Sequence, residues 1–210
     1  MTAPLTFYTH PMSRGRVSRW MLEETGLPYD TVLLDYGSTM KAPEYLAINP
    51  MGKVPALKHG DTVITETAAI ITFLAEQFPD KNLIPAPATA ERGEFYRWLF
   101  FSIHAEYAIM DQWFGTPESA ERSRAIGYGS FQQTLHTLES LLTTRKYAVG
   151  DHFTALDLYL SGLIGWGIER GQVLPAEGVL ADYMKPHFAR PAFLHAQELD
   201  NALAKEMGLV

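Results

Sequence analysis

Hydrophobic and polar positions follow different spacings in the two parts of the chain. In the first part, residues 5–8 and the alternating stretch 29–34 are typical of short β-strands, with an apolar helical pattern between them. Residues 54–58 and 62–64 predict two more strands around a glycine-containing turn, and apolar residues at helical spacing follow over residues 70–78. The pattern therefore predicts the element order βαβ and then ββα.

The second part of the chain shows only helical spacing. Residues 81–90 contain prolines without periodicity, which is typical of a linker. Apolar stripes beyond this linker predict helices over residues 91–114, 119–142, 154–168 and 193–207. We therefore expect an α+β, thioredoxin-like domain over residues 1–80 and an all-α domain over residues 91–210.

Composition and charge exclude several classes of function. The chain has 210 residues, a net charge of −7 and no cysteine. The negative charge argues against nucleic acid or an anionic membrane as partner, and the absence of cysteine excludes a protein thiol as nucleophile. The seven histidines lack metal-binding spacing, and no apolar leader or long apolar run is visible. We therefore expect no bound metal and a cytoplasmic location.

A polar motif at the start of one expected helix has a structural explanation. Thr154-Ala155-Leu156-Asp157 places a hydroxyl at the first position and a carboxylate three residues later. This spacing is a variant of the capping box, in which each side chain satisfies a free amide of the other residue. The sequence therefore predicts that Asp157 caps a helix and takes no part in catalysis.

The most informative residues form two short motifs, Val54-Pro55 and Glu66-Thr67, separated by about one hairpin. Proline cannot donate to a sheet ladder, so Pro55 indicates an edge or a special turn. A cis bond before Pro55 would turn the backbone N–H and C=O of Val54 outward, toward a ligand. Glu66-Thr67 precedes an apolar helical run, and a helix N-terminus favours a bound carboxylate. Together the motifs predict a site for an extended peptide with a terminal carboxylate.

These motifs and the order of the predicted elements resemble the glutathione S-transferase family along nearly the whole chain. The resemblance implies that Thr67 binds the γ-glutamyl carboxylate of glutathione, and that Glu66 binds its amino group. It implies that the Val54 backbone pairs with the cysteinyl unit beside Pro55. Two lysines, Lys53 and, with a weaker claim, Lys41, are candidates for the glycyl carboxylate. In the structural alternative, the two lysines are solvated, and Thr67 is an ordinary cap of the helix.

The residue that stabilises the thiolate is expected in the loop from Tyr8 to Arg16. In the family, a tyrosine, serine or cysteine in this loop contacts the sulfur. Alignment on the serine and cysteine subgroups selects Ser13, which we favour, whereas alignment on the tyrosine subgroups selects His10. Alternatively, Ser13 is a plain N-cap and His10 is a surface histidine. In that case a backbone N–H of the loop could stabilise the thiolate.

The resemblance further implies a homodimer that conjugates reduced glutathione, as co-substrate, to small hydrophobic electrophiles in detoxification. The electrophile pocket is expected between the two domains, with Met12, His104 and Tyr107 as candidates; helix residues of this kind are more often core or subunit contacts. Two rival functions stay open. One is a non-catalytic binding or interaction protein on the same fold, and the other is a glutathione-dependent peroxidase or isomerase.

Overall fold

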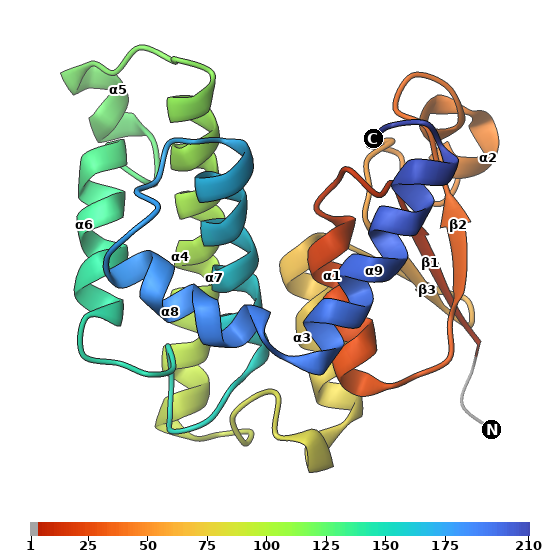
Figure 1. Ribbon diagram of the computed structural model, residues 1–210, viewed down its shortest axis with the longest axis horizontal. Coiled ribbons are helices and arrows are strands. Elements are labelled where there is room, and N and C mark those ends of the chain that lie inside the picture. The colour runs from red at the N-terminus through yellow and green to blue at the C-terminus, as the bar shows by residue number, and fades with distance from the viewer. Residues whose placement is uncertain (1–3) are drawn as a thin grey trace. The chain divides into compact units, whose positions relative to one another are not determined.

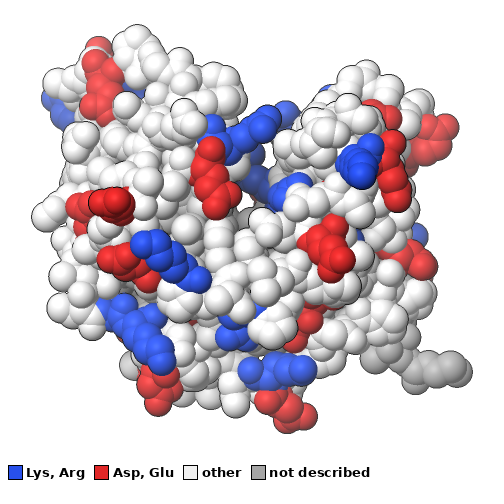
Figure 2. Space-filling model, viewed as in Figure 1, with Lys and Arg blue, Asp and Glu red and all other residues white. Residues whose placement is uncertain are grey.

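The computed structural model describes residues 4–210, which form two compact units. The first unit contains residues up to Lys81 together with Pro191–Val210, and the second contains Asn82–Arg190. Figure 1 shows the sheet and the helices that belong to each unit. Acidic and basic side chains are interspersed over the face seen in Figure 2, so the net negative charge does not form one acidic field there.

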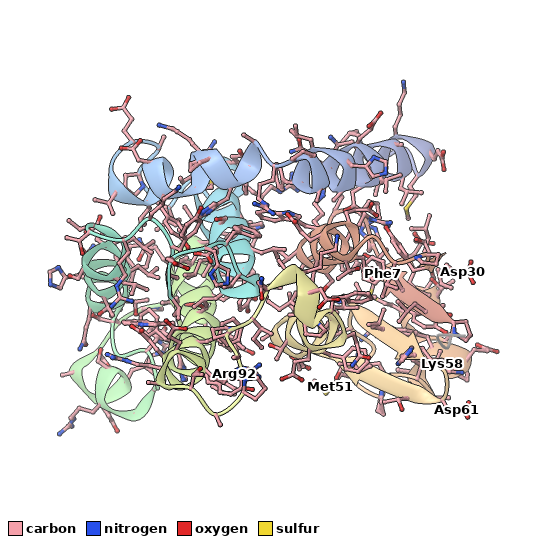
Figure 3. All side chains as sticks on the ribbon, turned by 90° about the horizontal axis from the view of Figure 1, so that it is seen from below. Phe7, Asp30, Met51, Lys58, Asp61 and Arg92 are labelled. Atoms are coloured by element: carbon pink, nitrogen blue, oxygen red, sulfur yellow. The ribbon has the colours of Figure 1, made fainter. Side chains whose placement is uncertain are left out.

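The first unit is built on a four-stranded sheet in the order β2-β1-β3-β4. The strands are β1 (Leu5–Thr9), β2 (Asp30–Leu33), β3 (Ala56–His59) and β4 (Thr62–Thr65). β1 pairs with β2 in parallel and with β3 antiparallel, and β3 pairs antiparallel with β4. Alternate residues of β1 are buried, and Phe7, labelled in Figure 3, is fully buried. This mixed sheet confirms the thioredoxin-like fold predicted from the element order.

Helices complete the first unit. They are α1 (Gly15–Thr25), η1 (Thr39–Lys41), α2 (Pro43–Leu46), α3 (Thr67–Gln77), η2 (Pro79–Lys81) and α9 (Pro191–Glu206). α1 packs against both α3 and α9. Gly15 allows α1 to begin close to the sheet, because a Cβ at this position would lie 1.9 Å from the Thr9 hydroxyl.

The last helix belongs to a different unit from the one expected, because the predicted boundary placed all residues after 90 in the helical domain. α9 belongs to the first unit, and Figure 1 shows it beside α1. A buried ion pair joins Arg19 of α1 to Asp200 of α9 at 2.8 Å, and the Trp20 and Phe193 rings meet edge to face at 4.8 Å. These contacts bury the inner face of α9, and no local sequence pattern reveals which domain supplies the partner.

The second unit is all-helical, as predicted. Its elements are α4 (Ala90–Trp113), α5 (Ala120–Ala125), α6 (Phe131–Leu142), α7 (Ala155–Gly165), the π-helical turn η3 (Trp166–Arg170) and α8 (Val179–Phe188). Large apolar side chains such as Phe95, Ile109 and Leu138 are almost fully buried between these helices. Within residues 4–210, no helix is long and apolar enough to cross a membrane.

Two details of the second unit correct the predicted helices. The helix expected over residues 119–142 is interrupted between α5 and α6, because Ile126 is extended, Gly129 has a φ of 75° and Ser130 caps α6 through the Gln133 amide. The apolar stripe continues across this break and hides it in the sequence. α8 was not predicted, and it contains Pro186, a residue that normally argues against a helix interior.

The predicted capping box at α7 is confirmed. The Asp157 carboxylate accepts hydrogen bonds from the Thr154 amide at 2.7 Å and from the Thr154 hydroxyl at 2.9 Å. It also accepts from the Ala148 amide at 2.7 Å and from the Tyr183 hydroxyl at 2.6 Å. Asp157 is fully buried, so its charge is stabilised by these donors and not by water.

Candidate functional site

The register of the sheet brings four chain segments to one edge. Tyr8 of β1 pairs with Ala56 of β3, and Ala56 pairs with Thr65 of β4. The end of β1, the start of β3 and the end of β4 therefore lie side by side, and the end of β2 joins them through the pairing of Thr9 with Leu33. Val54-Pro55 directly precedes β3, Glu66-Thr67 directly follows β4, and the loop that leads to α1 follows β1. The sheet therefore brings these three segments together from distant parts of the sequence.

The segment before β3 meets the condition under which the Val54 backbone is expected to turn outward. The Val54–Pro55 bond is cis, Pro55 is buried, and the Val54 side chain packs against the buried cluster of Leu34, Met40, Tyr45 and Ala56. Within residues 4–210, neither the N–H nor the C=O of Val54 has a hydrogen-bond partner. Because its side chain is packed against the core and its N–H and C=O are unpaired, Val54 can pair with the backbone of an extended peptide.

The loop that leads to Val54 is held by three side chains. The Lys53 carbonyl accepts hydrogen bonds from the Tyr45 hydroxyl at 2.5 Å and from Asn49 Nδ2 at 2.8 Å. Burial raises the pKa of Tyr45 to about 12, so its hydroxyl stays a donor. Lys41 Nζ donates to the Gly52 carbonyl at 2.8 Å and to the Met51 carbonyl at 3.2 Å.

These contacts distinguish the two candidate lysines. The Lys41 ammonium is used within the loop, which supports a role in holding the backbone at Gly52, where φ is 55°. The Lys53 side chain is exposed and makes no ion pair in the described part of the chain. Met51, labelled in Figure 3, is also exposed at this loop. Lys53 is therefore the better placed cation for an anionic ligand beside Val54.

The N-terminus of α3 is open. α3 has no side-chain cap, and the amides of Thr67, Ala68 and Ala69 have no acceptor within residues 4–210. Thr67 is buried, and its hydroxyl has no partner in the same part of the chain. An open helix N-terminus with a neighbouring hydroxyl has the donors that a carboxylate requires.

Glu66, directly before α3, has a strained backbone. Its φ is 67° and its ψ is 123°, a region that non-glycine residues rarely occupy. The exposed Glu66 side chain projects from this conformation next to the free amides of α3. Strain of this kind is retained at functional sites when the resulting placement of a side chain is useful.

The loop between β1 and α1 is organised around the Ser13 hydroxyl. Ser13 Oγ donates to the His10 carbonyl at 2.6 Å and accepts from the Gly15 amide at 2.9 Å. The His10 carbonyl also accepts from the Ser13 amide at 3.0 Å. The Ser13 hydroxyl can therefore turn away without leaving this carbonyl unpaired. The N-cap position of α1 belongs to Arg14 and has no side-chain cap, so Ser13 is not the plain N-cap of the structural alternative.

His10 is not the surface histidine that the structural alternative assumed. Only 4% of the residue is exposed, and its ring lies 4.3 Å from the ring of Tyr36. Burial lowers the pKa of the His10 imidazole, although the Asp35 carboxylate opposes this shift. The Met12 amide donates to Nδ1 at 3.1 Å, so the neutral ring carries its proton on Nε2. His10 can thus serve as a neutral N–H donor.

The predicted electrophile residues are divided between the two units. Met12 is half-buried in the first unit, whereas His104 and Tyr107 lie on α4 in the second. Tyr107 is 65% exposed, and the His104 ring packs close to Gly127. Their role in an electrophile pocket stays a prediction. No group of three or more metal-ligating side chains occurs among the described residues.

One contact of the site loop was missed by sequence reasoning. The Arg16 guanidinium joins the Pro11 carbonyl to Asn201 of α9. Arg16 and Asn201 are separated by 185 positions, so no local signal could have paired them.

Comparisons with known proteins agree with this geometry. Residues 7–82 match the family model described as the glutathione S-transferase N-terminal domain. The chain is 30% identical over 167 residues to glutathione S-transferase 3 of Zea mays, which covers 74% of each chain. It is also 26% identical over 182 residues to a stringent starvation protein A homolog of Histophilus somni, covering 85% of this chain and 82% of that one.

Solved structures are similar over almost the whole chain. A glutathione transferase from Methylococcus capsulatus has a TM-score of 0.77 at 30% identity and covers 94% of this chain and 99% of its own. A sphingomonad glutathione S-transferase complexed with glutathione has a TM-score of 0.75 at 25% identity, covering 93% of this chain and 98% of its own. These similarities extend through both the mixed sheet and the helical unit.

Proposed function

We propose that this chain, which belongs to the glutathione S-transferase family, binds glutathione at the shared edge of its sheet and joins it, through its sulfur, to small hydrophobic electrophiles. The observation that carries the proposal is the meeting of three features at that edge: the unpaired Val54 backbone, the open N-terminus of α3 and the hydroxyl of Ser13. A tripeptide with two carboxylates and a thiol uses each of these features.

Glutathione is proposed to lie extended along this edge. Its γ-glutamyl carboxylate accepts from the Thr67 hydroxyl and the first amides of α3, and its amino group faces the Glu66 carboxylate. The cysteinyl unit pairs with the Val54 backbone, and Lys53 neutralises the glycyl carboxylate. Lys41, whose ammonium binds the Met51 and Gly52 carbonyls, supports the loop without touching the ligand.

The chemistry requires the thiolate form of glutathione. A free thiol has a pKa of about 8.5, and lowering it by two units needs about 2.7 kcal/mol in favour of the anion. The Ser13 hydroxyl turns from the His10 carbonyl to the sulfur, and the Gly15 amide, which donates to Ser13 Oγ, strengthens it as a donor. The thiol proton leaves to solvent, and the thiolate attacks the electrophile, which accepts the electron pair or expels its leaving group.

Ser13→Ala tests the assignment of the thiolate donor. We expect the conjugation rate at neutral pH to fall about tenfold through the loss of one charge-assisted hydrogen bond, with little change in glutathione affinity. Steady-state kinetics against a chromogenic electrophile, together with calorimetry, measure the two quantities separately. An unchanged rate would transfer the role to the Nε2–H of His10 or to a loop amide.

Glu66→Gly separates the function of this residue from the strain of its backbone. Glycine adopts a positive φ readily, so we expect the free energy of unfolding to stay equal or to rise by up to about 1 kcal/mol. Loss of the carboxylate should nevertheless weaken glutathione binding by roughly tenfold. Urea unfolding and calorimetry on the same preparation decide the matter; equal affinity in both proteins would show that Glu66 does not bind the amino group.

A second candidate is a non-catalytic binding protein on the same fold; one relative, a stringent starvation protein A homolog, is not named as a transferase. Calorimetric titration with reduced glutathione comes first, because saturable binding supports the glutathione site and its absence removes the transferase proposal. Turnover with an electrophile, compared with turnover of an organic peroxide, then distinguishes conjugation from peroxidase activity. A homodimer and a cytoplasmic location stay part of the proposal, and sedimentation of the purified protein tests the dimer.

A further inference from the structure

The Arg16 side chain connects two segments from opposite ends of the chain. Its Nε donates to the Pro11 carbonyl at 2.6 Å, and its Nη2 donates to Asn201 Oδ1 of α9 at 2.8 Å. A guanidinium has several donors in a fixed plane, so holding one donor on Asn201 restricts the direction in which Nε points. Arg16 thus fixes Pro11 relative to α9.

Pro11 lies at the centre of the loop that carries both candidate sulfur donors. Three successive carbonyls of this loop are each bound differently: that of His10 by Ser13, that of Pro11 by Arg16, and that of Met12 by the Tyr36 hydroxyl at 3.2 Å. The first contact is internal to the loop, while the other two hold it from outside. The Arg16 contact is the one that depends on α9.

α9 is a firm support for this contact. Asp200, next to Asn201, is fully buried in its ion pair with Arg19, and Arg19 also donates to the Tyr29 hydroxyl at 3.0 Å. This part of α9 cannot move relative to α1 without breaking the buried ion pair. Asn201 is exposed, and its amide oxygen accepts from Arg16 on the same turn of α9 that Asp200 anchors.

We propose that Arg16 and Asn201 are positioning residues, through which the C-terminal helix holds the loop of His10 and Ser13 in the geometry that stabilises the thiolate. The inference rests on the proposed glutathione function but also makes a claim about the free protein. In the free protein, the Arg16–Asn201 contact maintains two hydrogen bonds of this loop, from the Met12 amide to His10 Nδ1 and from the Gly15 amide to Ser13 Oγ.

The test compares Asn201→Ala with Gln197→Ala. Gln197 is exposed one helical turn earlier on α9 and makes no hydrogen bond in the described chain, so it is the matched control. In Asn201→Ala we expect the pKa of the bound thiol, read from its ultraviolet thiolate absorbance, to rise by about half a unit, with about a threefold lower kcat/KM below that pKa. Gln197→Ala should leave both unchanged. Arg16→Lys, which keeps the charge but loses the fork, should behave like Asn201→Ala.

A purely structural role predicts a different result. If Asn201→Ala lowers the free energy of unfolding but leaves the thiol pKa and the pH profile of kcat/KM unchanged, the inference is overturned. If the unmodified protein does not bind glutathione, the proposed function fails first, and amide hydrogen exchange in the free protein decides the positioning claim. Faster exchange at Met12 and Gly15 in Asn201→Ala, but not in Gln197→Ala, upholds that claim, and equal exchange rejects it.

Discussion

Replacing Asp157 by alanine is expected to lower the free energy of unfolding by about 3–5 kcal/mol. The Asp157 carboxylate is fully buried and accepts four hydrogen bonds, two from Thr154 and one each from Ala148 and Tyr183. Alanine would leave all of these donors buried without an acceptor and would open a small cavity at the start of α7. The measurement is urea unfolding followed by tryptophan fluorescence.

Two further variants make the Asp157 prediction testable even if the alanine variant does not fold. Tyr183→Phe removes one of the four donors and leaves the carboxylate otherwise satisfied, so we expect a loss of about 1 kcal/mol. Asp151→Ala is the matched control, because the Asp151 side chain is 99% exposed and its loss should stay within about 0.5 kcal/mol. Equal stability of the Asp157 and Asp151 variants would contradict a central role for the capping box.

Thr67→Val is expected to weaken glutathione binding about 10- to 100-fold, with little effect on folding. Valine keeps the shape and burial of the Thr67 side chain and removes only its hydroxyl, which has no partner within residues 4–210. Folding therefore loses little, whereas the γ-glutamyl carboxylate loses a charge-assisted hydrogen bond at the open end of α3. Calorimetric titration gives the affinity directly.

Thr72→Val is the control for this experiment. Thr72 lies in the same helix, and its hydroxyl bonds the Ala68 carbonyl at 2.7 Å, away from the open N-terminus. Its replacement makes the same chemical change, so glutathione affinity should not alter. If Thr67→Val binds as tightly as the unmodified protein, or if both variants lose affinity equally, the carboxylate is not bound at the start of α3.

Local chemistry explains which features could be predicted from the sequence. The capping box of Thr154 and Asp157 was predictable because its partners are three residues apart. The β-prone residues of β1 and the helical stripe of α4 were readable because each is a property of a single element. The break between α5 and α6 was missed, since one apolar stripe continues across Gly129 and conceals the capping serine that follows.

The candidate site was identified from the sequence as a set of residues but not as an arrangement. Val54 and Thr67 were selected by motif and Ser13 by the family resemblance, and the pairing of Tyr8, Ala56 and Thr65 in the sheet brings their segments to one edge. For other residues the sequence offered the right charge but could not specify the contact. Lys41 illustrates this, because its ammonium binds backbone carbonyls and not an open position for a ligand.

By itself, the sequence determined the element order, the helical second unit and the two motifs, since each depends on interactions within a few residues or on one repeating period. Only the tertiary structure decided that α9 joins the first unit, through Arg19 and Asp200, and that Asn201 supports the loop beside β1 through Arg16. These pairings join residues more than 180 positions apart. A buried charge requires a partner, but its own neighbourhood in the sequence does not say which of the distant charges will provide it.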